Sequence, residues 1–122
     1  MTDTKLLDSS VWIDYFYNGN HKEIIDGDEL VLLSVISIYE IRKKLSLKNS
    51  VNKVELAMKK VKERSLIIPI DNEIAENGVE ISMKHNLPMA DSIIYATAQV
   101  HKGIVVTLDN HFRKLDKVIF ID

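Results

Sequence analysis

Four acidic residues stand at comparable places along the chain. Asp8 and Asp109 each follow a short apolar run, and Glu40 and Asp91 each lie in the first turn of a predicted helix. Carboxylates that a fold brings together repel one another unless a cation neutralises them. The chain has no cysteine, and its histidines show no ligand spacing, so the donors are oxygens, which suit Mg²⁺ or Mn²⁺. A metal-activated water attacking a phosphodiester is the natural chemistry of such a site.

Each of these carboxylates also has a purely structural explanation. Asp8 could cap the helix that follows it, and Glu40 could complete a capping box with the serine three residues before it. Asp91 could complement the dipole of its helix, and Asp109 could form an Asx-turn or cap the short segment 111–115. The metal interpretation therefore requires all four side chains to reach the same edge of one sheet.

Alternating strand and helix patterns predict how the four residues are positioned. Short apolar runs bounded by turn residues indicate five strands, at 6–7, 30–33, 66–68, 104–107 and 118–121. Apolar residues at helical spacing indicate the helices between them: one after Asp8, a short one at 21–25, and others from Ser37, from Val51, after Asp71 and around 93–101. This order predicts an α/β fold in which a parallel sheet carries helices on both faces, a single three-layer domain over residues 1–122.

Composition narrows the class of protein. The 122 residues are 46% hydrophobic and 28% charged, and no apolar run approaches the roughly 20 residues that span a bilayer. With no secretory signal and no cysteine, we expect a cytoplasmic protein that does not bind a membrane. The formal charge is −2 and would be +2 without the four carboxylates, so the remaining surface is mildly basic and could hold an RNA backbone.

Four stretches together resemble a protein family. They are Leu7-Asp8-Ser9-Ser10-Val11-Trp12-Ile13-Asp14, the lone Glu40, Ala90-Asp91-Ser92-Ile93-Ile94-Tyr95-Ala96-Thr97-Ala98, and Val106-Thr107-Leu108-Asp109. In order and spacing they resemble a PIN domain, and most of all the VapC-type toxins of prokaryotic toxin–antitoxin pairs. The resemblance implies a five-stranded parallel sheet in the order 3-2-1-4-5 and a Mg²⁺- or Mn²⁺-dependent endoribonuclease that acts on single-stranded or looped RNA. It also implies a homodimer and a small antitoxin protein that blocks the site.

The resemblance further implies a role for each site residue. Asp8 and Asp91 would be the principal metal ligands. Glu40 and Asp109 would complete the acidic catalytic site, through a second metal or a metal-bound water. Two hydroxyl residues would support the carboxylates: Ser10 and Thr107.

One position departs from the family's pattern. His111 stands two residues after Asp109, where the family often has a second acidic residue, and this leaves the affinity for a second metal open. The four histidines are too scattered along the chain to predict a metal set, and we expect ordinary surface or half-buried roles for them. His111 alone lies near the predicted site, where it could contact a phosphate or a leaving group.

Two other functions are alternatives to a nuclease. A receiver-like or phosphatase domain would use Asp8 as a phosphoryl acceptor, but it would need a paired acidic motif near the first strand, an Asp ending the third strand and a Lys ending the fifth, whereas the third predicted strand ends at Ile68-Pro69-Ile70. A non-catalytic interaction module with the same fold would be expected to lose at least one acidic position, and all four are present. The aromatic first helix and the helices between Ser37 and Arg64 are the predicted association surfaces.

Overall fold

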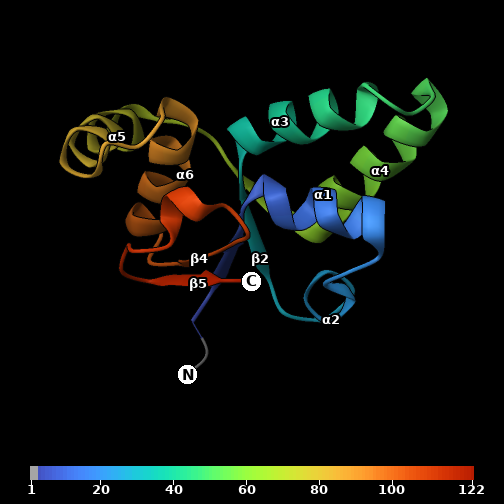
Figure 1. The fold of residues 1–122 in the computed structure, drawn as a ribbon, viewed down its shortest axis with the longest axis horizontal. Coiled ribbons are helices and arrows are strands. Elements are labelled where there is room, and N and C mark those ends of the chain that lie inside the picture. The colour runs from blue at the N-terminus through green and yellow to red at the C-terminus, as the bar shows by residue number, and fades with distance from the viewer. Residues whose placement is uncertain (1–2) are drawn as a thin grey trace.

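A five-stranded parallel sheet forms the centre of the molecule, in the strand order β3-β2-β1-β4-β5 (Figure 1). The structure is a computed structural model that describes residues 3–122. The strands are β1 (Lys5–Leu7), β2 (Val31–Ser34), β3 (Ser65–Ile68), β4 (Ile104–Thr107) and β5 (Val118–Phe120). The predicted fold class and strand order are confirmed.

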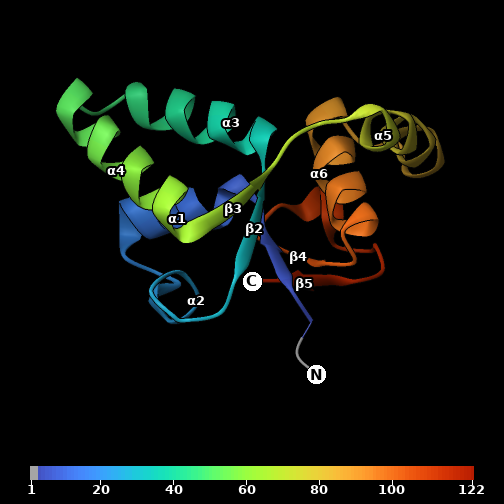
Figure 2. The same ribbon diagram turned by 180° about the vertical axis from the view of Figure 1, so that it is seen from behind.

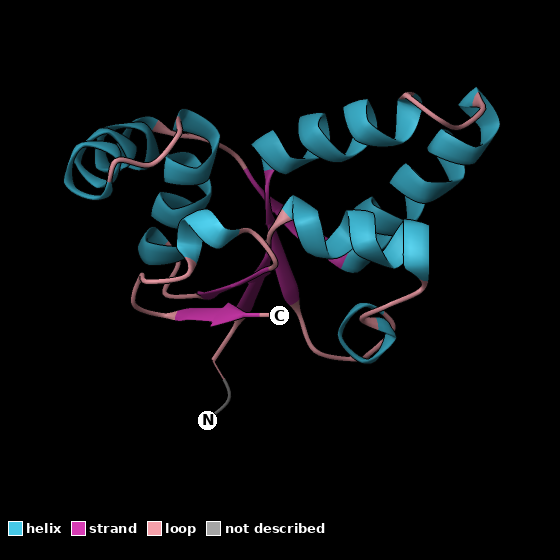
Figure 3. Ribbon diagram, viewed as in Figure 1, coloured by secondary structure: helices cyan, strands magenta, loops and turns pink. Residues whose placement is uncertain are grey.

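Helices cover both faces of this sheet (Figures 1 and 2). On one side lie α1 (Ser9–Asn18), α2 (Lys22–Ile25), α3 (Val35–Ser46) and α4 (Val51–Arg64), and on the other α5 (Asn72–His85) and α6 (Met89–Val100), with the short 3₁₀ helix η1 (Asn110–Phe112) after β4. Figure 3 shows the strands between these two groups of helices. The α3–α4 hairpin extends from the end of β2 away from the sheet (Figure 1).

Alternating side chains in the strands supply both hydrophobic cores. Leu6 pairs in register with Leu32 and Val105, and all three face α5 and α6. The next residue of β1, Leu7, faces the opposite side, where it packs in one cluster with the fully buried Trp12 of α1. Because successive residues of a strand point to opposite faces, a sheet covered on both sides needs continuous apolar runs, and the sequence shows such runs.

The boundary between β2 and α3 differs from the predicted one. The strand starts at Val31, not at Leu30, whose side chain is exposed, and the helix starts at Val35 rather than at Ser37. Ser34 is both the last residue of the strand and the N-cap of the helix, because its hydroxyl accepts a hydrogen bond from the Ile36 amide at 3.3 Å. The periodicity predicted both elements correctly. Because Ser34 belongs to the strand and also caps the helix, the predicted start of the helix was two residues too late.

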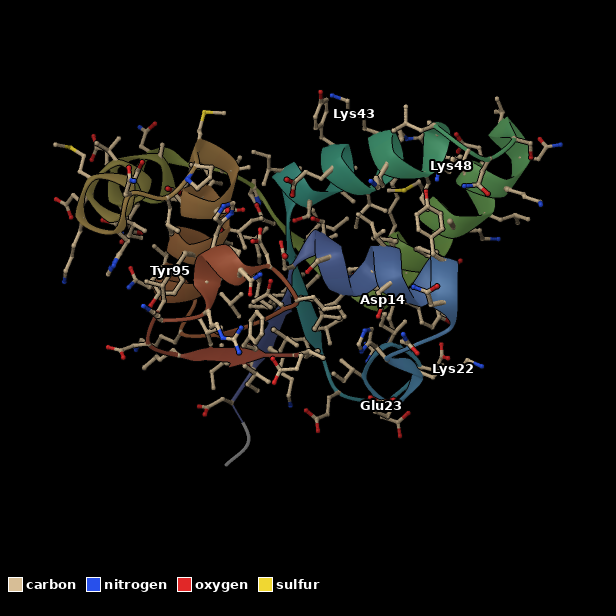
Figure 4. All side chains as sticks on the ribbon, viewed as in Figure 1. Asp14, Lys22, Glu23, Lys43, Lys48 and Tyr95 are labelled. Atoms are coloured by element: carbon tan, nitrogen blue, oxygen red, sulfur yellow. The ribbon has the colours of Figure 1, made fainter. Side chains whose placement is uncertain are left out.

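Gly19 ends α1 in the left-handed conformation, with φ of 72°, which glycine adopts readily. The loop to α2 is then held by Asp14, which lies on the α2 side of α1 (Figure 4). Its carboxylate accepts hydrogen bonds from Asn18 at 2.6 Å and Asn20 at 3.0 Å and contacts His21 Nε2 at 2.6 Å. Asp14 thus has a structural role. Within residues 3–122, no helix is long and apolar enough to cross a membrane.

Candidate metal centre

Asp8 occupies the N-cap position of α1, yet its side chain makes no capping hydrogen bond. Its Oδ2 instead accepts hydrogen bonds from the Ser10 hydroxyl at 2.7 Å and the Thr107 hydroxyl at 2.8 Å. The Asp8 amide donates to the Val106 carbonyl at 3.0 Å, so the residue is tied to β4 by backbone as well as side chain. The interpretation of Asp8 as a simple helix cap is therefore wrong, and the carboxylate faces the end of β4.

Two hydroxyl groups connect this carboxylate to the loop after β4. Ser10 Oγ donates to Asp8 and accepts from the Leu108 amide at 3.0 Å. Thr107 Oγ1 donates to Asp8 and accepts from the Asp109 amide at 2.9 Å. Each hydroxyl donates its one hydrogen to Oδ2 of Asp8, and the two bonds fix the orientation of the carboxylate. The hydroxyl groups leave the other oxygen, Oδ1, open to another partner. Both predicted supporting residues lie beside the carboxylates.

Glu40 lies in the second turn of α3 rather than the first, because the helix begins directly after Ser34. The predicted capping box with Ser37 is consequently wrong: Ser37 is a fully buried residue inside the helix, and Ser34 is the cap. The Glu40 side chain turns toward α1, where Oε1 accepts a hydrogen bond from the Ser9 hydroxyl at 3.1 Å. Ser9 and Glu40 are 31 residues apart in sequence, and this hydrogen bond holds the Glu40 side chain at the edge of the sheet where Asp8 lies.

Asp91 and Asp109 meet at His111. Asp91 lies in the first turn of α6, as predicted, and its Oδ2 is 2.8 Å from His111 Nδ1. Asp109 caps η1, since its Oδ1 accepts from the His111 amide at 2.9 Å, and the same oxygen is 3.1 Å from His111 Nδ1. Asp109 thus has the capping role that the sequence allowed as an alternative, on a helix at 110–112 rather than 111–115, and this role coexists with a place in the acidic cluster.

The four carboxylates perturb one another electrostatically. Burial raises the pKa of Asp8, and the charge of Asp109 raises it further. The pKa of Glu40 is raised by burial and then by Asp8, with smaller effects of Asp91 and Asp109. Burial, Asp109 and Asp8 together raise the pKa of Asp91 to about 6. All four predicted site carboxylates therefore lie near one edge of the sheet, and the clustering disfavours the ionised forms of Asp8, Glu40 and Asp91.

The arrangement suits a divalent cation. Ligand atoms of Asp91, Asp109 and His111 lie within 4.8 Å of one another, the one such group of potential ligands found in residues 3–122. Asp8 and Glu40 are outside this group but add negative charge to it. Buried carboxylates of raised pKa gain most from a counter-charge, and a donor set of mostly oxygens fits a hard divalent ion.

His111 is the site residue that sequence reasoning placed least well. We expected ordinary surface or half-buried roles for the histidines, but the Nδ1 atom of His111 contacts two carboxylates. The negative charges of Asp109 and Asp91 raise the pKa of its imidazole. Its position two residues after Asp109 was visible in the sequence, but the contact with Asp91, 20 residues earlier, depends on how α6 packs beside η1.

Fold and site together define an α/β domain with an acidic cluster at the carboxyl edge of a parallel sheet, where such folds build their sites. Residues 5–118 match the PIN domain family, and the chain belongs to it. Proteins of this family are typically metal-dependent nucleases. A search of curated protein sequences found no match.

Solved structures of toxin–antitoxin systems share the fold along their whole length. A toxin–antitoxin complex from Klebsiella pneumoniae contains a chain that is 24% identical, with a TM-score of 0.77 and coverage of 95% of this chain and 96% of that one. DNA-bound VapBC from Salmonella typhimurium matches at 14% identity and a TM-score of 0.80, covering 99% and 98%. VapC20 of Mycobacterium tuberculosis, a toxin that cleaves the sarcin–ricin loop, matches at 12% identity and a TM-score of 0.76, covering 94% and 97%.

Proposed function

We propose that the chain is a divalent-cation-dependent endoribonuclease and the toxin of a type II toxin–antitoxin pair. The observation that carries the proposal is the gathering of Asp8, Glu40, Asp91 and Asp109 at one edge of a PIN-domain sheet, with raised pKa values for the first three. A fold has little reason to assemble mutually repelling buried carboxylates unless a cation completes the site. Similarity to VapC toxins supports the same activity.

Each carboxylate has its own task in this proposal. When bound, Mg²⁺ or Mn²⁺ would polarise a phosphodiester and lower the pKa of a water molecule. Asp91 and Asp109 would hold the ion, with Asp8 presenting the Oδ1 that its hydroxyl partners leave free. Glu40 uses Oε1 for its bond to Ser9, so Oε2 can accept a proton from an attacking water.

Lysines on α3 and in the turn after it would position the RNA backbone. Lys44 follows Glu40 by one helical turn and therefore lies on the same side of α3. Lys43 on α3 and Lys48 in the turn are also exposed, and Figure 4 shows Lys43 projecting from the outer side of α3. Among residues 3–122, salt bridges engage Arg42, with Glu55, but not these three lysines. Their charges are thus available to phosphates that lead into the site.

The direct test is cleavage of RNA by the purified chain. We expect it to cut single-stranded RNA in the presence of Mg²⁺ or Mn²⁺, to stop when EDTA is added and to resume with excess metal. A single-stranded DNA of the same sequence is the control for nuclease contamination and for substrate class. Binding of RNA without cleavage under all metal conditions would favour the alternative, a non-catalytic interaction module.

Exposed apolar side chains supply surfaces for a second copy and for an antitoxin. A groove between α1 and the α3–α4 hairpin lies on the association surface predicted from the sequence, and its lining includes the exposed Tyr17, the partly buried Phe16 and the polar side chains Asn49 and Lys53. A second apolar surface lies on α5 and α6, where three side chains are largely exposed: Val79, Met83 and Met89. Exposed apolar area of this kind is typical of interfaces.

We expect the isolated chain to be a dimer at micromolar concentration, measured by light scattering. Tyr17→Glu in the groove and Met83→Glu on α5 change side chains that are 40% and 81% exposed, so neither should unfold the monomer. The substitution that produces monomers identifies the face used by the second copy. A strictly monomeric parent at high concentration, with no antitoxin gene beside its own, would contradict the toxin assignment.

A further inference from the structure

The position of His111 is fixed by the backbone rather than by its own side chain. Its amide donates to Asp109, and the next residue, Phe112, is fully buried and anchors η1 in the core beneath α6. The imidazole itself is 58% exposed. The backbone therefore places Nδ1 beside the carboxylates of Asp91 and Asp109, while much of the ring stays exposed to solvent.

The spacing of the three donor atoms fits a shared metal ion. In an octahedral site with bonds of about 2.1 Å, adjacent ligand atoms lie about 3 Å apart. His111 Nδ1 is 2.8 Å from Asp91 Oδ2 and 3.1 Å from Asp109 Oδ1, and ligand atoms of all three residues lie within 4.8 Å of one another. An ion that reaches the two carboxylates would therefore have the imidazole nitrogen at the distance of an adjacent ligand.

A nitrogen donor changes which ion such a site prefers. Mg²⁺ favours carboxylates and water, whereas imidazole is a good ligand for first-row transition ions, whose affinities exceed that of Mg²⁺ at nitrogen sites. We propose that His111 Nδ1 is a metal ligand together with Asp91 and Asp109, and that it makes the site select Mn²⁺ over Mg²⁺. This inference rests on the proposed function, because it specifies the cation of the same site.

The same contacts allow one competing role, with the opposite consequence. A hydrogen on Nδ1 would let the imidazole donate to the two carboxylates and take the place of the cation. Removing a ligand lowers the affinity for Mn²⁺ selectively, whereas removing a competitor raises the affinities for Mn²⁺ and Mg²⁺ together.

Calorimetric titration of the metal-free full chain with MnCl₂ and with MgCl₂ measures this selectivity. We expect tighter binding of Mn²⁺ by the parent, and His111→Asp should reduce the Mn²⁺-over-Mg²⁺ preference by about tenfold or more, the range typical of altered metal sites. His111→Asn tests loss of the imidazole without added charge. His101→Asn, at an exposed histidine on the end of α6, is the matched control. Circular dichroism checks that every variant is folded.

Pulsed electron paramagnetic resonance of the Mn²⁺-loaded chain gives a readout that does not depend on activity. Coupling to a ¹⁴N nucleus is expected in the parent and in His101→Asn and should be lost in both His111 variants. If the parent binds Mn²⁺ without nitrogen coupling, or if His111→Asn tightens both ions alike, the inference is wrong while the nuclease proposal stands. If the parent binds neither ion and cleaves RNA equally well in EDTA, the proposed metal-dependent function itself is wrong.

Discussion

Replacing Asp8 or Asp91 by asparagine should lower RNA cleavage by about 10²- to 10⁴-fold while the chain stays folded. Asparagine keeps the shape of the side chain but removes a negative charge from the cluster that would hold the cation. In Asp8→Asn the hydroxyls of Ser10 and Thr107 still find an acceptor oxygen, so the loop after β4 should keep its position. The loss of activity would then report charge and not misfolding.

Glu55→Gln is the matched control for these two variants. Glu55 lies on α4, is 57% exposed and pairs with Arg42 at 2.8 Å, an exposed ion pair that contributes little to stability. Its loss should leave cleavage unchanged. Parent-like cleavage by Asp8→Asn, after contaminating nucleases have been excluded, would remove Asp8 from the catalytic site.

Divalent metal should raise the melting temperature of the parent by several degrees. An ion that binds only the folded chain adds about 2.7 kcal/mol to the free energy of unfolding when its concentration is 100 times the dissociation constant. For a domain of this size that corresponds to about 10 °C at most. Asp8→Asn should reduce the shift, because it weakens the attraction of the site for the ion. Unchanged melting of the parent in Mn²⁺ would mean that no metal site exists.

In the absence of metal, Asp8→Asn should raise the free energy of unfolding or leave it unchanged. Burial and Asp109 raise the pKa of Asp8, so the ionised side chain costs the folded state free energy, and asparagine removes that cost. The variant in EDTA should therefore melt at or above the temperature of the parent. Lower stability of the variant both with and without metal would contradict the inference that the ionised Asp8 destabilises the metal-free fold.

The cluster should also make the metal-free parent less stable as pH rises. A carboxyl whose pKa is higher in the folded than in the unfolded chain binds protons more tightly when folded, so stability falls as pH passes through that interval. For Asp91 the interval runs from 3.8 to about 6, and its side chain is only 11% exposed. The cost from Asp91 alone is on the order of 2 kcal/mol. Denaturant unfolding in EDTA at pH 4 and pH 7 spans most of this interval and measures the cost, and Asp91→Asn should reduce the difference.

The fold and the approximate location of the site could be predicted from the sequence alone. Continuous apolar runs alternating with helical patterns predicted the parallel sheet, and the bounds of β4 match the structure. Once the strands are parallel, their carboxyl ends share an edge, so the approach of Asp8 and Asp109 followed from topology. These predictions rest on periodicity and chain direction, which are local properties of a sequence.

Only the tertiary structure decided what each side chain contacts. Glu40 reaches the site because α3 starts at Val35, after the Ser34 cap, and packs against α1, and no pattern in the sequence distinguishes that start from a capping box at Ser37. The meeting of His111 with Asp91 and the apolar face formed by α5 and α6 likewise depend on helix packing. Distances between residues far apart in the chain are set by how buried side chains fill the space between elements, and sequence spacing does not record them.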